Sequence, residues 1–304
     1  MLGYNKPLYI LPFDHRQSFA EKMFGWEDLF TIERVAKLAE YKQIIYEGFA
    51  LAVSRGVPKE SAAILVDEQC GDLILRQARQ AGFIVCMCTE KSGQAEFDFE
   101  FNHQFGEHLD KYRPQFAKAL LRYNPGGDEE LNERQRQRLA KLSDYCRTHG
   151  YKFMLEVLVP PTVDQLNKVQ ADHRRYNLEM RPDLAIKMVK ELQKGGVDPD
   201  VWKIEGFQEM ENYQDVIKQM RKGRRGQVCM IVLGRGETRE LVEKWIETGA
   251  RVDGVIGFAV GRTVFWQALV DFKSEKITRE QAVEQIANNF KYFADLFIRF
   301  KFSS

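Results

Sequence analysis

Residues 228–262, VCMIVLGRGETRELVEKWIETGARVDGVIGFAVGR, show the pattern that decides the fold. An apolar run at 228–236 is followed by an amphipathic stretch at 237–248 and by a second apolar run at 252–262. Short apolar runs without alternation are typical of strands that are buried on both faces, as in parallel sheets. The periodicity between the two runs indicates a helix. The stretch therefore predicts one strand–helix–strand unit.

The same pattern continues towards the amino terminus. Further apolar runs are PLYILPFD (7–14), AAILVDEQ (62–69), FIVCMCTE (83–90), FAKALLRYNP (116–125), KFMLEVLVPP (152–161) and VWKIEGF (201–207). Amphipathic stretches lie between runs, at 33–55, 131–149, 183–195 and 211–222, and THGYKF and ETGARVDG place glycines where helices are expected to stop. Eight strands alternating with helices predict an α/β fold, the (β/α)8 TIM barrel, in a single domain spanning 1–304.

A doubly wound open sheet is the alternative fold. Its nucleotide-binding versions carry a GxGxxG motif after the first strand or a P-loop, and neither motif occurs in this chain. The barrel is therefore the favoured prediction.

The composition limits the class of protein. Hydrophobic residues make up 44% of the 304 residues and charged residues 29%, which predicts a packed core. The formal net charge is +1 without a long run of one sign, which argues against nucleic-acid and membrane partners. The cysteines are odd in number, five, and form no CxxC pair, so we expect a reducing, cytoplasmic location. The apolar run at 7–14 is too short for a signal peptide or a membrane span.

For each of two segments, the sequence allows two interpretations. The long connection at 160–200 is either a lid over an active site or a plain surface insertion. The segment 278–300 predicts an amphipathic helix that closes the bottom of the barrel or contacts another subunit, and we expect a homo-oligomer.

Polar residues gather near the carboxyl ends of the predicted strands, where barrel enzymes have their active sites. They are Asp14 with His15 and Arg16, Asp67 with Glu68 and Gln69, Lys118 and Arg122, Glu156, Lys203 and Glu205, Gly234 with Arg235, and Gly261 with Arg262. A single such residue is usually a satisfied core group. A polar rim shared by seven strands predicts an active-site mouth.

The signs of these charges indicate a chemistry. A lysine such as Lys203 becomes a nucleophilic amine when burial and neighbouring cations lower its pKa. A nearby carboxylate such as Glu156 can move the protons that carbinolamine formation and carbon–carbon cleavage require. The combination predicts Schiff-base chemistry on a ketone. The alternative for Lys203 is a buried ion pair with Glu156 or Glu205, and the role of Glu205 stays open.

The last two predicted strands indicate a phosphate site. LGRG and VGRT each place a glycine and an arginine, Gly234 with Arg235 and Gly261 with Arg262, directly after a strand. Loops in these positions form the usual phosphate site of the barrel, because glycine lets backbone N–H groups approach and arginine binds phosphate bidentately. Arg262 also opens a predicted helix, whose amino terminus favours an anion.

We predict no metal and no cofactor. A zinc-dependent aldolase needs histidine ligands, and none of the five histidines falls near the last three predicted strand ends. A Mg²⁺ site made of Asp14, Asp67 and Glu68 would not explain why a lysine, Lys203, lies within a buried strand.

The motifs PLYILPFDHR, KALLRYNP, MLEVLVPP, VWKIEG and GFAVGRTVFW resemble those of class I aldolase barrels, over about residues 5–297. The chain is most similar to the aldolase-like domain fused to 5-dehydro-2-deoxygluconokinase in bacterial inositol catabolism. It resembles tagatose-1,6-bisphosphate aldolase and sulfofructose-phosphate aldolase more distantly.

The resemblance implies a role for each matching residue. Lys203 would be the Schiff-base lysine, Glu156 the acid/base carboxylate and Asp14 an aspartate near the substrate, with Lys118, Arg122, Gly234, Arg235, Gly261 and Arg262 binding the substrate and its phosphate. It implies a carbon–carbon lyase whose partner is a phosphorylated sugar or keto acid. The substrate would be 2-deoxy-5-keto-gluconate 6-phosphate, cleaved to dihydroxyacetone phosphate and malonate semialdehyde. The alternatives are a tagatose-1,6-bisphosphate or sulfofructose-phosphate type of aldolase, or a non-catalytic binder of sugar phosphates.

Overall fold

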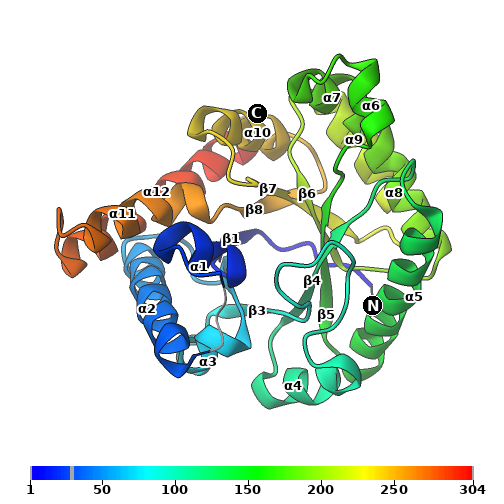
Figure 1. Cartoon of the computed structure of the whole chain (residues 1–304). Coiled ribbons are helices and arrows are strands. Elements are labelled where there is room, and N and C mark those ends of the chain that lie inside the picture. Colours follow the sequence, from blue (N-terminus) through cyan, green and yellow to red (C-terminus); the bar gives the residue numbers. More distant parts are fainter. Residues whose placement is uncertain (1, 28–30, 303–304) are drawn as a thin grey trace.

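The eight predicted apolar runs form parallel strands that close into a barrel in chain order (Figure 1). The computed structural model describes residues 2–27 and 31–302. Its strands are β1 (Leu8–Pro12), β2 (Ala62–Val66), β3 (Ile84–Cys88), β4 (Phe116–Arg122), β5 (Lys152–Leu158), β6 (Val201–Glu205), β7 (Cys229–Leu233) and β8 (Val255–Ala259). The barrel closes where β8 pairs with β1, with Phe258 opposite Tyr9. The predicted (β/α)8 barrel is confirmed, and the open sheet is excluded.

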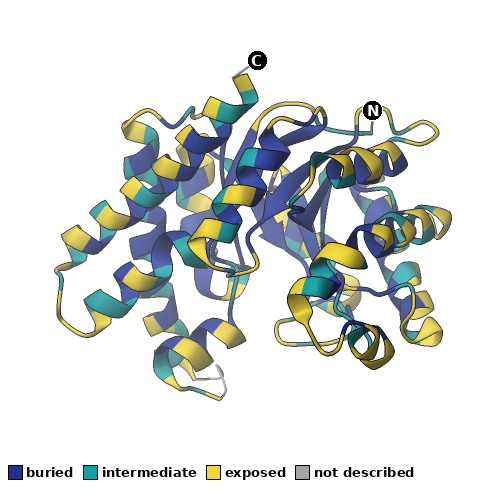
Figure 2. Cartoon of the chain, turned by 90° about the horizontal axis from the view of Figure 1, so that it is seen from above, coloured by how far each residue is buried: buried dark blue, intermediate teal, exposed yellow. Residues whose placement is uncertain are grey.

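Helices surround the barrel, and each α-helix has buried residues, whereas the short η1 (Asn102–Gln104) has none (Figure 2). They are α1 (Gln17–Phe24), α2 (Ile32–Ser54), α3 (Glu68–Gln80), η1 (Asn102–Gln104), α4 (Phe105–Tyr112), α5 (Glu129–His149), α6 (Val163–Lys168), α7 (His173–Glu179), α8 (Arg181–Lys194), α9 (Met210–Met220), α10 (Arg239–Ala250), α11 (Arg262–Lys273) and α12 (Arg279–Phe302). The predicted polar residues lie towards the carboxyl ends of the strands, where residues of α1 also line a cavity.

The barrel interior is apolar towards the amino ends of the strands. Its inward-facing cluster includes Phe116 of β4, Met154 of β5 and Val201 of β6, all fully buried. Side chains two residues apart in a strand point to the same side. The next inward positions towards the carboxyl ends are therefore Lys118, Glu156 and Lys203, so a charged layer lies directly on the apolar layers.

The carboxyl-terminal helix α12 lies in the outer layer. Its Phe293 and Phe297 pack against Phe258 of β8, whose ring also stacks on Tyr9 of β1. Because Phe258 and Tyr9 belong to the outer cluster of buried residues, α12 covers the side of the barrel. The expectation that this helix closes the bottom is therefore wrong. At the amino end of the barrel, Tyr4 packs edge-on against Phe116 instead, with ring centroids 5.0 Å apart.

The sequence predicted that a glycine ends each of two helices, and this holds for one of them. Gly150 follows α5 with φ of 78°, a left-handed conformation that favours glycine, and its N–H bonds to the carbonyl of Cys146. In contrast, α10 continues through Gly249 to Ala250. A Cβ on Gly249 would lie 3.1 Å from Val232 and 3.2 Å from the ring of Tyr213. This glycine therefore serves close packing and not helix termination.

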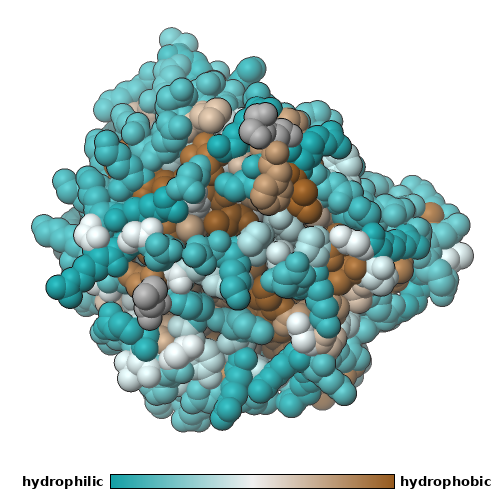
Figure 3. Space-filling view, turned by 180° about the vertical axis from the view of Figure 1, so that it is seen from behind, coloured by the Kyte–Doolittle hydropathy of each residue, from teal (hydrophilic) through white to brown (hydrophobic). Residues whose placement is uncertain are grey.

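The face opposite to that of Figure 1 is mainly hydrophilic, with apolar side chains gathered in smaller patches (Figure 3). Among the described residues, no helix combines the length and the apolar character needed to cross a membrane.

Candidate active site

A cavity of about 400 Å³ lies at the carboxyl ends of the strands. Its walls come from the segments after β1 and β3, from β4, β5 and β6, and from the ends of β7 and β8. The lining includes Asp14, Lys118, Arg122, Glu156, Lys203, Arg235, Gly261 and Arg262. All the residues to which the resemblance assigns a role, except Gly234, line this one cavity. The N–H of Gly234 donates to the carbonyl of Ala259 in the barrel, and its neighbour Gly236 lines the cavity instead.

Lys203 and Glu156 lie side by side on neighbouring strands. They are register partners in the β5–β6 ladder, so both side chains point inwards at the same height. Lys203 Nζ lies 2.7 Å from Glu156 Oε2, and the lysine is buried. A buried ammonium is stable only when it is paired, and Glu156 supplies the partner.

Lys118 connects three carboxylates. Its Nζ lies 2.7 Å from Asp14 Oδ2, 2.5 Å from Glu90 Oε1 and 3.0 Å from Glu156 Oε2. The contacts with Asp14 and Glu90 are hydrogen bonds, and the contact with Glu156 is an ion pair. Lys118 is 1% exposed, which makes it a structural cation between three acids and leaves Lys203 as the amine with a single carboxylate partner among the contacts described.

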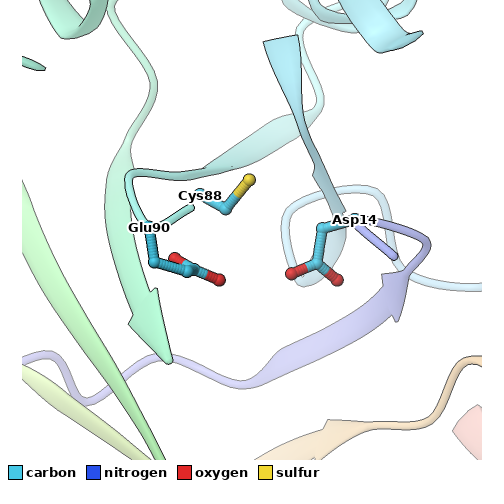
Figure 4. A group of neighbouring side chains, drawn as sticks. All are labelled: Asp14, Cys88 and Glu90. Atoms are coloured by element: carbon cyan, nitrogen blue, oxygen red, sulfur yellow. The ribbon is translucent and has the colours of Figure 1, made fainter. Parts of the chain in front are cut away.

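Glu90 and Arg16 belong to the site; the sequence missed Glu90, and it placed Arg16 in the polar rim without assigning it a role. Glu90 follows β3 and lies next to Asp14, with the side chain of Cys88 close by (Figure 4). Arg16 donates to the carbonyl of Glu90 at 2.5 Å and to Glu100 Oε2 at 2.7 Å. Both are buried and line the cavity. The signal available in the sequence is weak, because a charged residue after a strand is usually exposed.

Burial and neighbouring charges separate the pKa values of the carboxyl groups. Burial alone would raise the pKa of Glu156, but the nearby Lys118 and Lys203 outweigh it and lower that pKa. The pKa of Asp14 is lowered in the same way, mainly by Lys118 acting against burial. Burial prevails at Glu90, whose pKa is raised although Lys118 opposes the shift. Glu156 and Asp14 are therefore the carboxylates suited to stay ionised.

His15 lies beside Asp14 in the same wall. Burial lowers its pKa to about 4, with Arg262 and Lys203 adding to the effect and Asp14 opposing it. Among the described residues, the buried side-chain atoms without a hydrogen-bonding partner are His15 Nδ1, Arg16 Nε and Glu90 Oε2. All three belong to residues that line the cavity. Such atoms are rare in packed cores, and their concentration here favours a functional site.

One group of side chains within the described residues has metal-ligand spacing: Asp14, Cys88 and Glu90. Burial raises the pKa of the Cys88 thiol far above its usual range, which disfavours the thiolate that binds metals. The Lys118 ammonium already contacts both carboxylates of this group. This donor set therefore fits a lysine better than a metal ion.

The ends of β7 and β8 form a cationic wall. Arg262, the first residue of α11, donates from Nη2 to the carbonyl of Arg235 at 2.6 Å. A Cβ on Gly261 would lie 2.3 Å from the carbonyl oxygen of Pro12, so only glycine lets β8 approach β1 this closely. Two guanidinium groups and the amino terminus of a 12-residue helix meet here, which suits a phosphate group.

Glu205 contacts Arg235 and not Lys203. Its Oε1 lies 2.5 Å from Arg235 Nη1, and the residue is 1% exposed. Arg122, at the end of β4, donates to the carbonyl of Gln94 at 2.8 Å and so holds the 90–97 loop, which forms one wall of the cavity.

The predicted polar rim is wrong at the end of β2. Asp67 is fully buried, accepts the N–H of Cys70 as the amino-terminal cap of α3, and pairs with Lys42 from α2. Glu68 contacts Lys111 and His108 on the outside of the barrel. Neither acid lines the cavity, so the Mg²⁺ site that included them is not assembled.

The 160–200 connection forms α6, α7 and α8 and contributes none of the described residues that line the cavity. Instead, it packs against the ends of β5 and β6. Tyr176 donates to the carbonyl of Val159 at 2.8 Å, and Arg181 donates to the carbonyls of Glu205 and Gly206. In this structure the connection supports the strands that carry Glu156 and Lys203.

The closed barrel of parallel strands places the chain among (β/α)8-barrel proteins. The chain belongs to the family described as "uncharacterized protein conserved in bacteria (DUF2090)", whose sequence profile matches residues 4–300. No curated protein sequence matches the chain significantly.

Several solved structures share the fold. A fructose-bisphosphate aldolase from Plasmodium falciparum, solved with TRAP and a small-molecule inhibitor, has a TM-score of 0.68 and 12% identity, covering 96% of this chain and 91% of its own. An archaeal fructose 1,6-bisphosphate aldolase has a TM-score of 0.58 and 13% identity, covering 94% of each chain. A Schiff-base-forming fructose-1,6-bisphosphate aldolase has a TM-score of 0.56 and 13% identity, covering 93% of each chain. At these identities the likeness establishes the fold.

Proposed function

We propose that this chain is a class I aldolase, a carbon–carbon lyase that forms a Schiff base with a phosphorylated ketose or keto acid. The observation that carries the proposal is the contact between Lys203 Nζ and Glu156 Oε2, 2.7 Å, in a cavity at the carboxyl ends of the strands. An amine next to a carboxylate that stays ionised is the pair that imine formation and retro-aldol cleavage require. The fold shared with several aldolases is consistent with this proposal.

The proposed reaction begins with a proton transfer from the Lys203 ammonium to Glu156. The amine then attacks the ketone carbon, Glu156 returns the proton to the departing hydroxyl group, and loss of water gives an iminium ion. Glu156 takes the proton of the hydroxyl group β to that carbon, the carbon–carbon bond breaks, and its electron pair moves to the iminium nitrogen. The aldehyde leaves, Glu156 returns its proton to the enamine carbon, and hydrolysis of the resulting iminium ion releases the ketone and restores Lys203. No metal is needed, because the iminium ion accepts the electron pair.

The charge distribution supports a phosphorylated substrate. Arg235 and Arg262 lie at the ends of β7 and β8, next in order around the barrel after Lys203 on β6. In the proposed substrates the carbon that carries the phosphate is bonded to the ketone carbon. A phosphate bound at these arginines would therefore bring the ketone close to the Lys203 amine. Asp14 lines the same cavity and would contact a substrate hydroxyl group, whereas Lys118 would hold Asp14, Glu90 and Glu156 in place.

At a finer level, we propose 2-deoxy-5-keto-gluconate 6-phosphate as the substrate, with dihydroxyacetone phosphate and malonate semialdehyde as products. This choice rests on the resemblance of the motifs around Asp14, Lys118, Glu156, Lys203 and Arg262 to the aldolase-like domain of inositol catabolism. Tagatose 1,6-bisphosphate and sulfofructose phosphate are the alternatives. Assaying cleavage of all three, with detection of dihydroxyacetone phosphate, separates them.

Trapping with borohydride tests the proposal. Incubation with dihydroxyacetone phosphate and borohydride should add one reduced triose-phosphate mass to the peptide that contains Lys203. Lys203→Met should fold normally but give neither adduct nor cleavage, whereas Lys187→Met, which removes an exposed lysine of α8, should behave like the unaltered chain. An adduct on a different lysine, or no adduct, contradicts the mechanism. Binding of sugar phosphates without an adduct or turnover would favour a non-catalytic binder.

A further inference from the structure

Glu205 is a buried carboxylate whose contacts lead away from the reacting amine. It lies two residues after Lys203 on β6, is 1% exposed, and its Oε1 lies 2.5 Å from Arg235 Nη1. Its other oxygen accepts a long hydrogen bond, 3.4 Å, from the N–H of Val159 after β5. Glu205 does not line the cavity, but Arg235 does. The carboxylate therefore reaches the cavity only through this arginine.

Arg235 is held at both its side chain and its backbone. Its φ of 50° is left-handed, a conformation that side chains other than glycine seldom adopt and that needs support from the surroundings. Glu205 holds the guanidinium, and Arg262 Nη2 donates to the carbonyl of Arg235 at 2.6 Å. The two cationic residues of the proposed phosphate site are thus linked to each other and to Glu205.

Arg181 in turn fixes the strand end that carries Glu205. Its Nη1 and Nη2 donate to the carbonyls of Glu205 and Gly206 at 3.1 and 2.5 Å. Its guanidinium lies 4.8 Å from the ring centre of Phe207 and 5.9 Å from that of Trp245, and the residue is 2% exposed. A buried guanidinium held between aromatic rings and two carbonyls leaves the end of β6 little freedom. Arg181 begins α8, so the 160–200 connection supports this strand end.

We propose that Glu205 is a positioning residue: it holds Arg235 so that the remaining N–H groups of the guanidinium face the substrate's phosphate. This inference rests on the proposed function. A guanidinium has five N–H donors in a fixed plane, so a carboxylate bound at one edge orients the others towards a second oxyanion. The competing explanation is that Glu205 only balances charge.

The two explanations predict opposite changes in phosphate affinity for Glu205→Gln. Removing a negative charge beside Arg235 strengthens phosphate binding if charge balance is the only role. Loss of orientation weakens it, because a neutral amide holds a guanidinium less firmly than a carboxylate does. We expect titration calorimetry with inorganic phosphate to show affinity about tenfold lower for Glu205→Gln. Unchanged or tighter binding, or no phosphate binding by the unaltered chain, overturns the proposal.

The matched control is Glu191→Gln. Glu191 of α8 accepts a hydrogen bond from Tyr123 at 2.7 Å and does not line the cavity. The phosphate affinity of Glu191→Gln should therefore equal that of the unaltered chain. If Glu205→Gln does not fold, Glu205→Asp retains the charge but shortens the side chain, and it should also weaken phosphate binding. Phosphate affinity equal to that of the unaltered chain in folded Glu205→Asp contradicts the proposal.

A double-mutant cycle shows whether Glu205 acts through Arg235. In an Arg235→Gln background, Glu205→Gln should cause no further loss of phosphate affinity, because the residue it positions is already absent. An equal loss in both backgrounds indicates a general structural effect and overturns the proposal.

Trapping experiments separate this inference from the proposed function. In Glu205→Gln, half-maximal trapping with borohydride should need about tenfold more dihydroxyacetone phosphate, with the same adduct yield at saturation. Unphosphorylated dihydroxyacetone should be trapped at the same concentrations in both proteins. Equal losses with both ketones contradict the positioning role. If no ketone is trapped at Lys203 in the unaltered chain, the aldolase proposal fails, while the phosphate titrations still decide the role of Glu205.

Discussion

Glu156 and Lys203 are register partners on adjacent strands of the barrel, and their charged atoms lie 2.7 Å apart. Because neighbouring parallel strands place register partners on the same side, this contact follows directly from the pairing of β5 with β6. Lys118 approaches the same oxygen of Glu156 from β4 at 3.0 Å. One carboxylate thus contacts two ammonium groups, of which Lys118 has two further acids and Lys203 has none among the described contacts.

We predict that Glu156→Gln separates imine formation from cleavage. The amide keeps the shape of the side chain but cannot accept the hydroxyl proton, so kcat should fall by about 10²- to 10⁴-fold. Borohydride should still label Lys203 with dihydroxyacetone phosphate to the same final yield, although more slowly. Cleavage kinetics and mass spectrometry of the labelled peptide measure the two effects.

The control for this prediction is Glu179→Gln, which removes an exposed acid that pairs with Arg175 on α7. It should leave both cleavage and labelling unchanged. Glu156→Gln with full cleavage activity would show that another group takes the proton.

Lys118→Met should destabilise the protein and should make it more stable at low pH than at high pH. The substitution leaves Asp14, Glu90 and Glu156 close together without their shared cation, which should cost about 3–5 kcal/mol in the free energy of unfolding at neutral pH. Like charges raise the pKa of buried carboxyl groups above that of the unfolded chain. Stability from such groups is present at low pH and is lost as pH rises through their folded pKa. Urea unfolding should therefore show the variant to be more stable at pH 5 than at pH 8.

Lys111→Met is the matched control, because Lys111 pairs with Glu68 on the surface. Exposed ion pairs contribute about 0–1 kcal/mol, so the control should lose little stability and keep its pH profile. A Lys118→Met variant as stable at pH 8 as the unaltered chain would contradict the role of Lys118 as a structural cation.

The sequence predicted Lys118, Glu156 and Lys203 because each interrupts an otherwise apolar run. A charge inside a buried strand has few explanations, and the strand period then places all three on the inner face. Asp67 shows the limit of this argument, since it also follows a buried strand but caps α3 and pairs with Lys42. Lys42 comes from α2, and only the packing of that helix shows that Asp67 is already paired with a lysine.

Glu90 shows the opposite case. It lies just beyond a strand, where a charged residue is usually exposed, and only the folded chain reveals that it is buried together with Arg16. The partner of Glu205 could not be predicted either, because Arg235 reaches it from a loop with left-handed backbone. Strand positions follow from pattern, whereas loop side chains depend on tertiary contacts.

Chelation should not affect this protein. Asp14 and Glu90 have the spacing of metal ligands, but Lys118 Nζ contacts both, at 2.7 and 2.5 Å. A divalent ion would have to displace an ammonium that already contacts three carboxylates. Dialysis against EDTA should leave labelling of Lys203 and the melting temperature unchanged, and added Zn²⁺ or Mg²⁺ should not raise either. Activity that is lost on dialysis and restored by one of these ions would contradict the assignment.

His15 should make the protein less stable as the pH falls from about 6.5 to about 4. Burial lowers its pKa to about 4 in the folded protein, against an ordinary value of 6.5, with Arg262 and Lys203 adding to the effect and Asp14 opposing it. Between these values the unfolded chain binds a proton that the folded protein does not. Protonation therefore favours the unfolded state progressively through this window, by up to about 3 kcal/mol.

His15→Gln isolates this contribution, because glutamine hydrogen-bonds but does not titrate. The difference in free energy of unfolding between the unaltered chain and the variant, measured by urea denaturation, should be constant above about pH 7. It should shift against the unaltered chain as the pH falls from 6.5 to 4. The lowered pKa values of Asp14 and Glu156 remove stability only at lower pH, as each carboxyl group takes up its proton in the folded state. Identical slopes for the two proteins between pH 6.5 and 4 would show that His15 takes up its proton equally easily when folded and when unfolded.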